Sequence, residues 1–256
     1  MWDFRSRYRR WRASQNPVEA HHWRDALETS RYAQRLSHND QATLRDLATQ
    51  FLSAKTFSGA HNISVTISMR TRIALHACLP VLRLGLGYYR NWRGVIVYPG
   101  DFRVQRTVQD EAGVVHEGME DLCGESLSQG PMVLSWEAML RETQAPDLDL
   151  VIHECAHKLD VLNGDADGFP PLPEEMLAST WTHEWKSAFD DFCQHVEAGR
   201  ETRIDPYAAT DPAEFFAVLS ETFFTTPRWI RDDYPAVYTQ LAVFYRQDTA
   251  ALLIET

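Results

Sequence analysis

Apolar side chains recur every three or four residues over much of the chain, which is typical of helices with one buried face. The clearest case is residues 38–55, where apolar positions share one face: Leu44, Leu47, Ala48, Phe51 and Leu52. We expect two or three helices over residues 17–55, a buried helix over 68–86 interrupted near Pro80, and further helices over 147–163, 174–199, 211–224 and the last twenty residues.

Alternating or β-branched apolar runs are fewer and shorter, and they predict strands. The candidate strands are residues 63–67, 94–99, 102–108, 114–116 and 131–136. Helical patterns dominate from residue 147 onward, so we expect an α+β fold, mostly helical, with a small sheet between helical layers. Residues 1–16 form a separate tail and 17–256 form one domain; two closely packed lobes that meet near residue 145 are the alternative.

Composition narrows the class of protein. The chain has 256 residues, of which 44% are hydrophobic and 24% charged, as in ordinary globular proteins. Its four cysteines are far apart and form no Cys-x-x-Cys pair, which favours a reducing compartment over a disulfide scaffold. The chain shows neither an apolar leader at its start nor a run of about 18 apolar residues, so we expect a soluble cytoplasmic protein without a membrane span.

Charge is distributed unevenly along the chain. Residues 1–100 carry 15 Lys and Arg against 6 Asp and Glu, whereas residues 101–256 carry 10 against 30. Such an acidic region repels nucleic acid and attracts cations or basic peptide ends, although it also serves simple solubility. The tail 1–16 holds five arginines among aromatic residues. Three roles are open for this tail: contact with the protein's own acidic surface, with an anionic membrane or with nucleic acid.

The strongest chemical signal is a His-Glu-x-x-His motif within the predicted helix 147–163. His153 and His157 lie one helical turn apart, so both imidazoles reach one metal ion. Glu154 is rotated by about 100° around the helix, which suits a base that holds a metal-bound water. Asp147 is a candidate N-cap for this helix. The alternative is two histidines on a partly buried helix face.

A catalytic zinc site needs a third protein ligand. The best segment is Asp205–Glu221, where Asp211 and Pro212 predict a helix start and place Glu214 at its third position. Glu214 therefore fits a metal ligand, but it also fits a residue that caps its own helix. Glu221 lies two turns further on a similar face, so spacing leaves both glutamates open.

Three segments together resemble the bacterial Mlc titration factor A family: Ile152-His-Glu-Cys-Ala-His-Lys-Leu-Asp160, Asn163-Gly-Asp165 and Tyr207-Ala-Ala-Thr-Asp-Pro-Ala-Glu-Phe-Phe-Ala-Val-Leu-Ser-Glu221. The resemblance spans most of residues 40–246. It implies a cytoplasmic zinc metallopeptidase with aminopeptidase-type activity and a zincin-like core similar to that of anthrax lethal factor. Some members of this family bind the glucose-regulon repressor Mlc, so a repressor protein is a possible partner beside a peptide substrate.

The resemblance also implies roles for individual residues. His153, His157 and Glu214 match the ligands of one Zn²⁺ per chain, and Glu154 matches the catalytic base. Tyr207 matches a catalytic tyrosine, with a tyrosine packed in the core as the alternative. His116 matches a histidine associated with the metal, with an ordinary loop histidine as the alternative.

Three further residues lie within or near these motifs. Asp160 and Glu221 are candidates for carboxylates that orient the ligand histidines. The alternatives are a surface position for Asp160 and a pairing with a surface arginine for Glu221. Cys155 lies inside the motif, where a small buried residue is expected rather than a ligand.

Two functions from different classes follow from the sequence. The first is a zinc-dependent peptidase that hydrolyses peptide bonds with a metal-activated water. The second is a regulatory binding protein that sequesters a transcriptional repressor, with the zinc site secondary. The intact Glu154 favours the peptidase, because a purely structural metal site needs no base.

Overall fold

A computed structural model describes residues 18–100, 102–109, 115–122, 124–126, 130–142, 145 and 147–253; only the backbone is described between 102 and 126. The predicted tail 1–16 lies outside these residues. The helices are α2 (Ala20–Leu27), α3 (Arg31–Arg35), α4 (His38–Ala54), α5 (Ile67–Cys78), α6 (Trp136–Arg141), α7 (Leu150–Asp160), α8 (Ala178–Glu197), α9 (Pro212–Thr225), α10 (Pro227–Asp233), α11 (Pro235–Tyr245) and α12 (Thr249–Leu252), with short 3₁₀ helices η1 (Leu86–Tyr89) and η2 (Pro206–Ala209).

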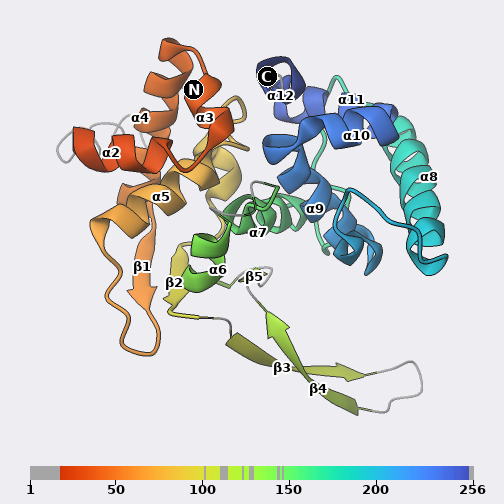
Figure 1. Cartoon of the computed structure of the whole chain (residues 1–256), viewed down its shortest axis with the longest axis horizontal. Coiled ribbons are helices and arrows are strands. Elements are labelled where there is room, and N and C mark those ends of the chain that lie inside the picture. Colours follow the sequence, from red (N-terminus) through yellow and green to blue (C-terminus); the bar gives the residue numbers. More distant parts are fainter. Residues whose placement is uncertain are drawn as a thin grey trace.

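The helices form two groups with α7 between them (Figure 1). Helices α2 to α5 lie on one side, and α8 to α12 on the other. Helix α7 contacts α5 of the first group and α9 of the second, and β5 and β6 also pack against it. The hydrophobic core is continuous from the N-terminal helices to α12. The expected α+β fold, mostly helical with a small sheet packed on the helix of the motif, is confirmed.

The main sheet has four strands in the order β1-β2-β6-β5: β1 (Thr56–Gly59), β2 (Gly94–Tyr98), β6 (Met132–Ser135) and β5 (Gly124–Ser126). Strands β1, β2 and β6 are parallel, and β5 runs antiparallel to β6. Strands β2 and β6 match the predictions over 94–99 and 131–136. No strand was predicted for the residues of β1 and β5.

Two strand predictions were wrong. Strands β3 (Phe102–Gln109) and β4 (Val115–Leu122) do not continue the main sheet, because they pair with each other as a separate two-stranded sheet. Residues 63–67 form no strand: Thr66 caps α5 by accepting a hydrogen bond from the backbone N–H of Met69. A β-branched run is therefore followed directly by a helix there.

Most helix predictions hold with bounds that differ by a few residues, but the helix predicted over 68–86 does not resume after Pro80, where turns lead to η1. Helix α5 ends at Cys78, two residues before Pro80, which cannot donate a backbone hydrogen bond within the helix. Helix α7 begins at Leu150, and its N-cap is Asp149 rather than Asp147, since the Asp149 carboxylate accepts from the N–H of Ile152. The helix then ends at Asp160, before the Asn163-Gly164 turn.

An aromatic cluster fixes α9 against α8 and α11. The rings of Trp181 and Trp185 on α8 are stacked with centroids 4.6 Å apart. Phe215 and Phe216 on α9 contact these indoles, and Phe244 on α11 contacts both Trp181 and Phe216. Buried aromatic rings contribute the largest apolar areas of a core, so this cluster holds the helix that carries Glu214.

Lys55 supports the corner where α4 leads into β1. Its side chain is buried, and its Nζ donates to the backbone oxygens of Tyr89 and Trp92, each at 2.6 Å. The same nitrogen lies 3.3 Å from the centre of the Trp92 ring. Burial lowers the pKa of Lys55 to about 7. A neutral amine still has two N–H donors, so both carbonyls are satisfied in either protonation state.

None of the described helices has the length and apolar character that crossing a membrane requires.

We predict that Lys55→Met lowers the free energy of unfolding by about 2–4 kcal/mol, because it leaves two buried carbonyls without donors. Lys186→Met is the control, since Lys186 pairs with Asp190 on the surface; this variant should change stability by less than about 0.5 kcal/mol. Urea unfolding of both variants measures the difference. Equal stabilities would show that Lys55 does not support this corner.

Candidate metal centre

Helix α7 presents the two histidines of the motif on one face. The backbone N–H of His153 donates to Asp149 O, which places His153 in the regular first turn of the helix. The Nε2 atoms of His153 and His157 lie 3.2 Å apart, and both rings are partly buried. Two imidazole nitrogens at this distance need a proton or a cation between them.

Helix α9 brings the third donor. Asp211 caps this helix by accepting from the N–H of Glu214, and Pro212 occupies its first position, as the sequence predicted. The side chain of Glu214 lies against the two histidines. Its Oε2 is 3.1 Å from His153 Nε2 and 3.3 Å from His157 Nε2.

These three donors have the spacing of a tetrahedral zinc site. Two ligand atoms that each lie about 2.0–2.1 Å from zinc are about 3.3 Å apart in tetrahedral geometry. The three distances among His153, His157 and Glu214 are 3.1, 3.2 and 3.3 Å. Two nitrogens and one carboxylate oxygen are also donors that zinc prefers. The residues present therefore fit a zinc ion.

The electrostatics of the site follow from burial of opposite charges. Burial alone would raise the pKa of Glu214, but hydrogen bonds with His153 and His157 hold it far below its usual range. Burial alone would lower the pKa of His153, yet the carboxylates of Glu214 and Glu221 raise it well above its usual value. The carboxylates thus create a strongly negative environment around the histidine rings, which favours a cation.

Glu154 has the environment expected of a base. The residue is 2% exposed, and within the described residues its Oε2 has no hydrogen-bond partner. Burial raises the pKa of Glu154 to about 7, although the neighbouring His157 and His153 oppose the shift. A buried acceptor without a partner is costly, so this oxygen fits a site that receives a water molecule.

Glu221 lies behind His153 rather than beside Glu214. Its Oε2 is 3.4 Å from His153 Nδ1, on the other side of the ring from Glu214. The carboxylate is buried, so the pairing with a surface arginine that the sequence also allowed is wrong. An acceptor at Nδ1 leaves the lone pair of Nε2 for a metal. This geometry favours Glu214 as the third donor and Glu221 as the orienting carboxylate.

Tyr207 lies at the edge of the site. It belongs to η2, its ring centroid is 6.4 Å from that of His153, and the residue is 43% exposed. The alternative of a tyrosine packed in the core is therefore wrong. His116 is on β4 opposite Val108, and its side chain lies outside the described part of the structure. Its association with the metal stays a prediction.

Asp160 holds the loop after α7 against the start of α9. It is fully buried, and its Oδ2 accepts from the N–H of Gly168. Gly168 has a φ of +75°, and a Cβ there would lie 2.5 Å from Pro212 O, so only glycine fits. The surface position that the sequence allowed for Asp160 is wrong, and its hydrogen bond is with this loop rather than with a ligand histidine.

Cys155 occupies the position expected of a small buried residue. Its thiol faces Ala77 O at 3.9 Å, on the side of α7 that contacts α5.

The sequence analysis did not identify His76 as a residue near the site. It lies on α5, and its Nδ1 is 2.5 Å from the carboxylate of Asp149, the N-cap of α7. The one available signal was a histidine between Leu75 and Ala77 in an apolar helix, where a buried partner is needed.

Two other polar clusters in the described regions do not match this arrangement. Glu19, His21 and His22 bring three donor atoms within 4.8 Å of one another, but they are largely exposed at the N-terminus of α2, where the helix dipole disfavours a cation.

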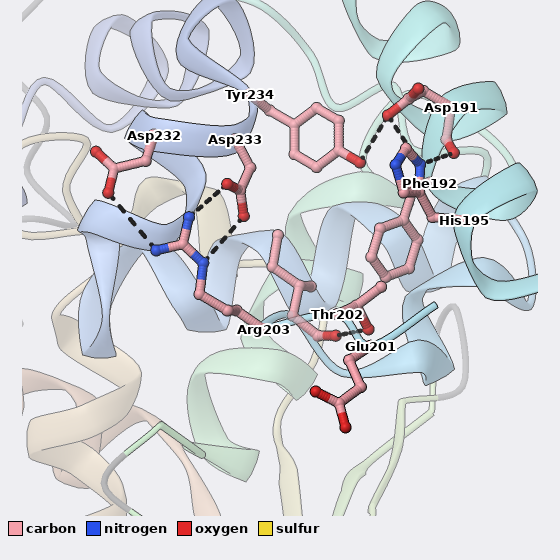
Figure 2. Close-up of a pocket in the computed structure, with 10 residues that line it drawn as sticks. Asp191, Phe192, His195, Glu201, Thr202, Arg203, Asp232, Asp233 and Tyr234 are labelled. Carbon is pink, nitrogen blue, oxygen red and sulfur yellow. Dashed lines mark hydrogen bonds and ion pairs between the residues drawn. The ribbon is translucent and has the colours of Figure 1, made fainter. Parts of the chain in front are cut away.

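A hollow of about 490 Å³ lies between α8, α10 and the loop before η2 (Figure 2). Three of the four carboxylates that line it, those of Asp191, Asp232 and Asp233, are paired within the protein. Arg203 bridges Asp232 and Asp233, and Tyr234 donates to Asp191. We assign no metal to this hollow.

Comparison with known proteins agrees with the geometry. The family described as glucose-regulated metallo-peptidase M90 matches residues 4–246. Mlc titration factor A of Pectobacterium atrosepticum is 39% identical over 247 residues, which cover 95% of this chain and 92% of that protein. Mlc titration factor A of Yersinia pestis is 38% identical over 247 residues, covering 95% and 91%. Mlc titration factor A of Yersinia pseudotuberculosis has the same identity and coverage.

We predict that His153→Ala and His157→Ala each remove most of the bound zinc while the protein stays folded, because the aromatic core lies elsewhere. Elemental analysis after gel filtration gives the zinc content, and circular dichroism reports the fold. Near-stoichiometric zinc in both variants would exclude these residues as ligands.

We also predict that Glu214→Ala weakens zinc binding by a larger factor than Glu221→Ala. A lost ligand removes a bond to the metal, whereas a lost orienting carboxylate costs about 10–100-fold in affinity. Competition with a chromophoric chelator measures both dissociation constants. The reverse ranking would make Glu221 the third ligand.

Proposed function

Because the chain belongs to the glucose-regulated metallo-peptidase M90 family, we propose that it is a zinc-dependent peptidase of the aminopeptidase type. The observation that carries this proposal is the convergence of three donor atoms beside a buried glutamate. His153, His157 and Glu214 would hold the zinc ion, and Glu154 lies next to them with an oxygen that lacks a described partner. A structural zinc site has no use for such a base.

The reaction follows from the chemistry of these side chains. A bound zinc ion would supply a water molecule of lowered pKa and a positive charge near the peptide carbonyl. Glu154 would take the proton that this water releases as it attacks the carbonyl carbon. It would then return that proton to the nitrogen of the leaving amine, so that one base serves as the acid later. Its burial suits this role, because a raised pKa makes both transfers feasible near neutral pH.

Tyr207 is proposed to donate a hydrogen bond to the oxygen that becomes negative in the transition state. Its position in η2 next to His153, with a substantial exposed fraction, supports access to a substrate. A phenol keeps its proton at neutral pH, so it donates without introducing a charge.

A preference for free amino-termini is consistent with the charge of the chain. Residues 101–256 carry a net charge of −20, from 10 basic and 30 acidic residues. A negative surface attracts a positively charged substrate end and raises the rate of encounter. The three described cysteines are free thiols, which supports action in a reducing compartment such as the cytoplasm.

Binding of a transcriptional repressor is the second candidate function. The relatives at 38–39% identity bear the name Mlc titration factor A. We propose that this chain either binds an Mlc-like repressor as well as acting on peptides, or acts mainly as such a binding protein with the metal site secondary. The two activities are compatible in one protein.

The decisive test compares the wild type with Glu154→Gln. We expect the wild type to bind one zinc ion and to cleave chromogenic aminoacyl substrates, and the variant to bind zinc but to lose at least about 100-fold in kcat. Zinc content and turnover are measured on the same preparation. Bound zinc without turnover of a broad peptide panel in the wild type would favour the repressor-binding function.

A second test concerns Tyr207→Phe. Loss of one hydrogen bond made in the transition state should lower kcat about ten- to a thousandfold and leave KM within a fewfold. Zinc should stay bound, because the phenol is not proposed as a ligand. Unchanged turnover would remove Tyr207 from the mechanism.

A further inference from the structure

A continuous line of polar contacts runs from the N-terminal helices to the metal centre. It begins at Thr29, whose Oγ1 is 2.7 Å from His76 Nε2, and continues with His76 Nδ1, which is 2.5 Å from Asp149 Oδ2. The backbone N–H of Asp149 donates to Glu221 Oε1, and Glu221 Oε2 lies 3.4 Å from His153 Nδ1. From His76 inward every member is buried or nearly so.

His76 has a polar partner at each ring nitrogen. Thr29 Oγ1 lies 2.7 Å from Nε2, and the same hydroxyl lies 2.7 Å from Ala26 O. At Nδ1 the ring faces the carboxylate of Asp149, which accepts the hydrogen bond. His76 is held on both sides and cannot rotate without breaking a buried hydrogen bond.

Asp149 is held at three points. Its Oδ2 meets His76, its Oδ1 accepts from the N–H of Ile152 at 3.1 Å, and its own N–H donates to Glu221. The two side-chain contacts orient Asp149, and with it the backbone N–H that donates to Glu221. Glu221 then spans the gap between that N–H and the imidazole of His153.

We propose that His76 and Asp149 are positioning residues of the metal centre, which hold Glu221 and through it the ring of His153 in the rotation that presents Nε2. The inference rests on the proposed metal site. Neither residue touches the substrate or the metal in this arrangement. Their effect would be to remove the alternative ring rotations and tautomers of His153 that bind metal poorly.

Glu142, the C-cap of α6, provides a matched control that contacts the start of the same helix α7. It is also a buried carboxylate that accepts an N–H of α7, that of Leu150 at 2.7 Å. Its other oxygen is 3.7 Å from Arg72. Burial and the neighbouring carboxylates of Asp149 and Glu221 raise the pKa of Glu142 to about 8, so a neutral Gln is a close match for it. The Gln variant therefore alters a buried carboxyl beside α7 without removing a hydrogen bond of the line from His76 to His153.

The experiment measures the zinc dissociation constant of the full chain by chelator competition, together with the melting temperature of the metal-free protein. We expect Asp149→Asn to weaken zinc binding about tenfold and His76→Gln at least about threefold, as for other residues that support a ligand histidine. Glu142→Gln should stay within about twofold of the wild type, even where its melting temperature falls.

Cobalt gives a second readout that helix stability alone would not move. The visible spectrum of Co²⁺ bound in the site reports ligand geometry, so it should change in Asp149→Asn and His76→Gln but not in Glu142→Gln. If Asp149→Asn does not fold, Thr29→Val cuts the line at its partly exposed end and should change the spectrum in the same direction.

The order of the contacts is tested in the Glu221→Gln background. Because the line passes through Glu221, Asp149→Asn should add less than about twofold to the loss that Glu221→Gln already causes. Fully additive losses, wild-type affinity in Asp149→Asn and His76→Gln, or an equal loss in Glu142→Gln would each overturn the inference. A wild type that binds no zinc would instead refute the proposed metal site itself.

Discussion

The antiparallel contact between α7 and α9 is the constraint on which the rest of the centre depends. Neither helix is long enough to be stable alone, with 11 and 14 residues. Contacts at both ends fix their alignment. At one end the N–H of Asp149 donates to Glu221. At the other end Asp160 accepts from the N–H of Gly168, which packs closely against Pro212 at the start of α9. Between these contacts lie the three donor atoms. A slip of either helix would separate Glu214 from the histidines, so the alignment of the backbone determines the chemistry.

Local sequence signals predicted the parts of the centre that lie within one helix. The spacing of His153 and His157 places both on one face in any helix, and Asp211-Pro212 starts a helix whatever surrounds it. The choice between Glu214 and Glu221 depends on how α9 lies against α7, which spacing within α9 does not encode. Resemblance to a known family supplied Glu214, and the geometry agrees with it.

Non-local features were the ones that sequence reasoning missed. His76 and Asp149 are far apart in the chain, and no periodicity connects a histidine on α5 with the cap of α7. The strands β1 and β5 were not predicted, because they are too short for a periodic pattern. Strand β1 has four residues that are mostly exposed, and β5 has three. The β-branched segment at residues 63–67 had strand propensity, but a threonine cap that starts α5 prevailed over it.

The placement of the three donor atoms on two helices links occupancy of the site to the stability of the folded chain. A ligand that binds only the native state stabilises it by RT ln(1 + [L]/Kd), about 2.7 kcal/mol at a hundredfold excess over Kd. Without a metal, the carboxylate of Glu214 and the rings of α7 would be held by the protein alone. The aromatic cluster would still hold α9 in place. Metal supply would therefore adjust the free energy of unfolding of the chain, on top of a core that folds by its own packing.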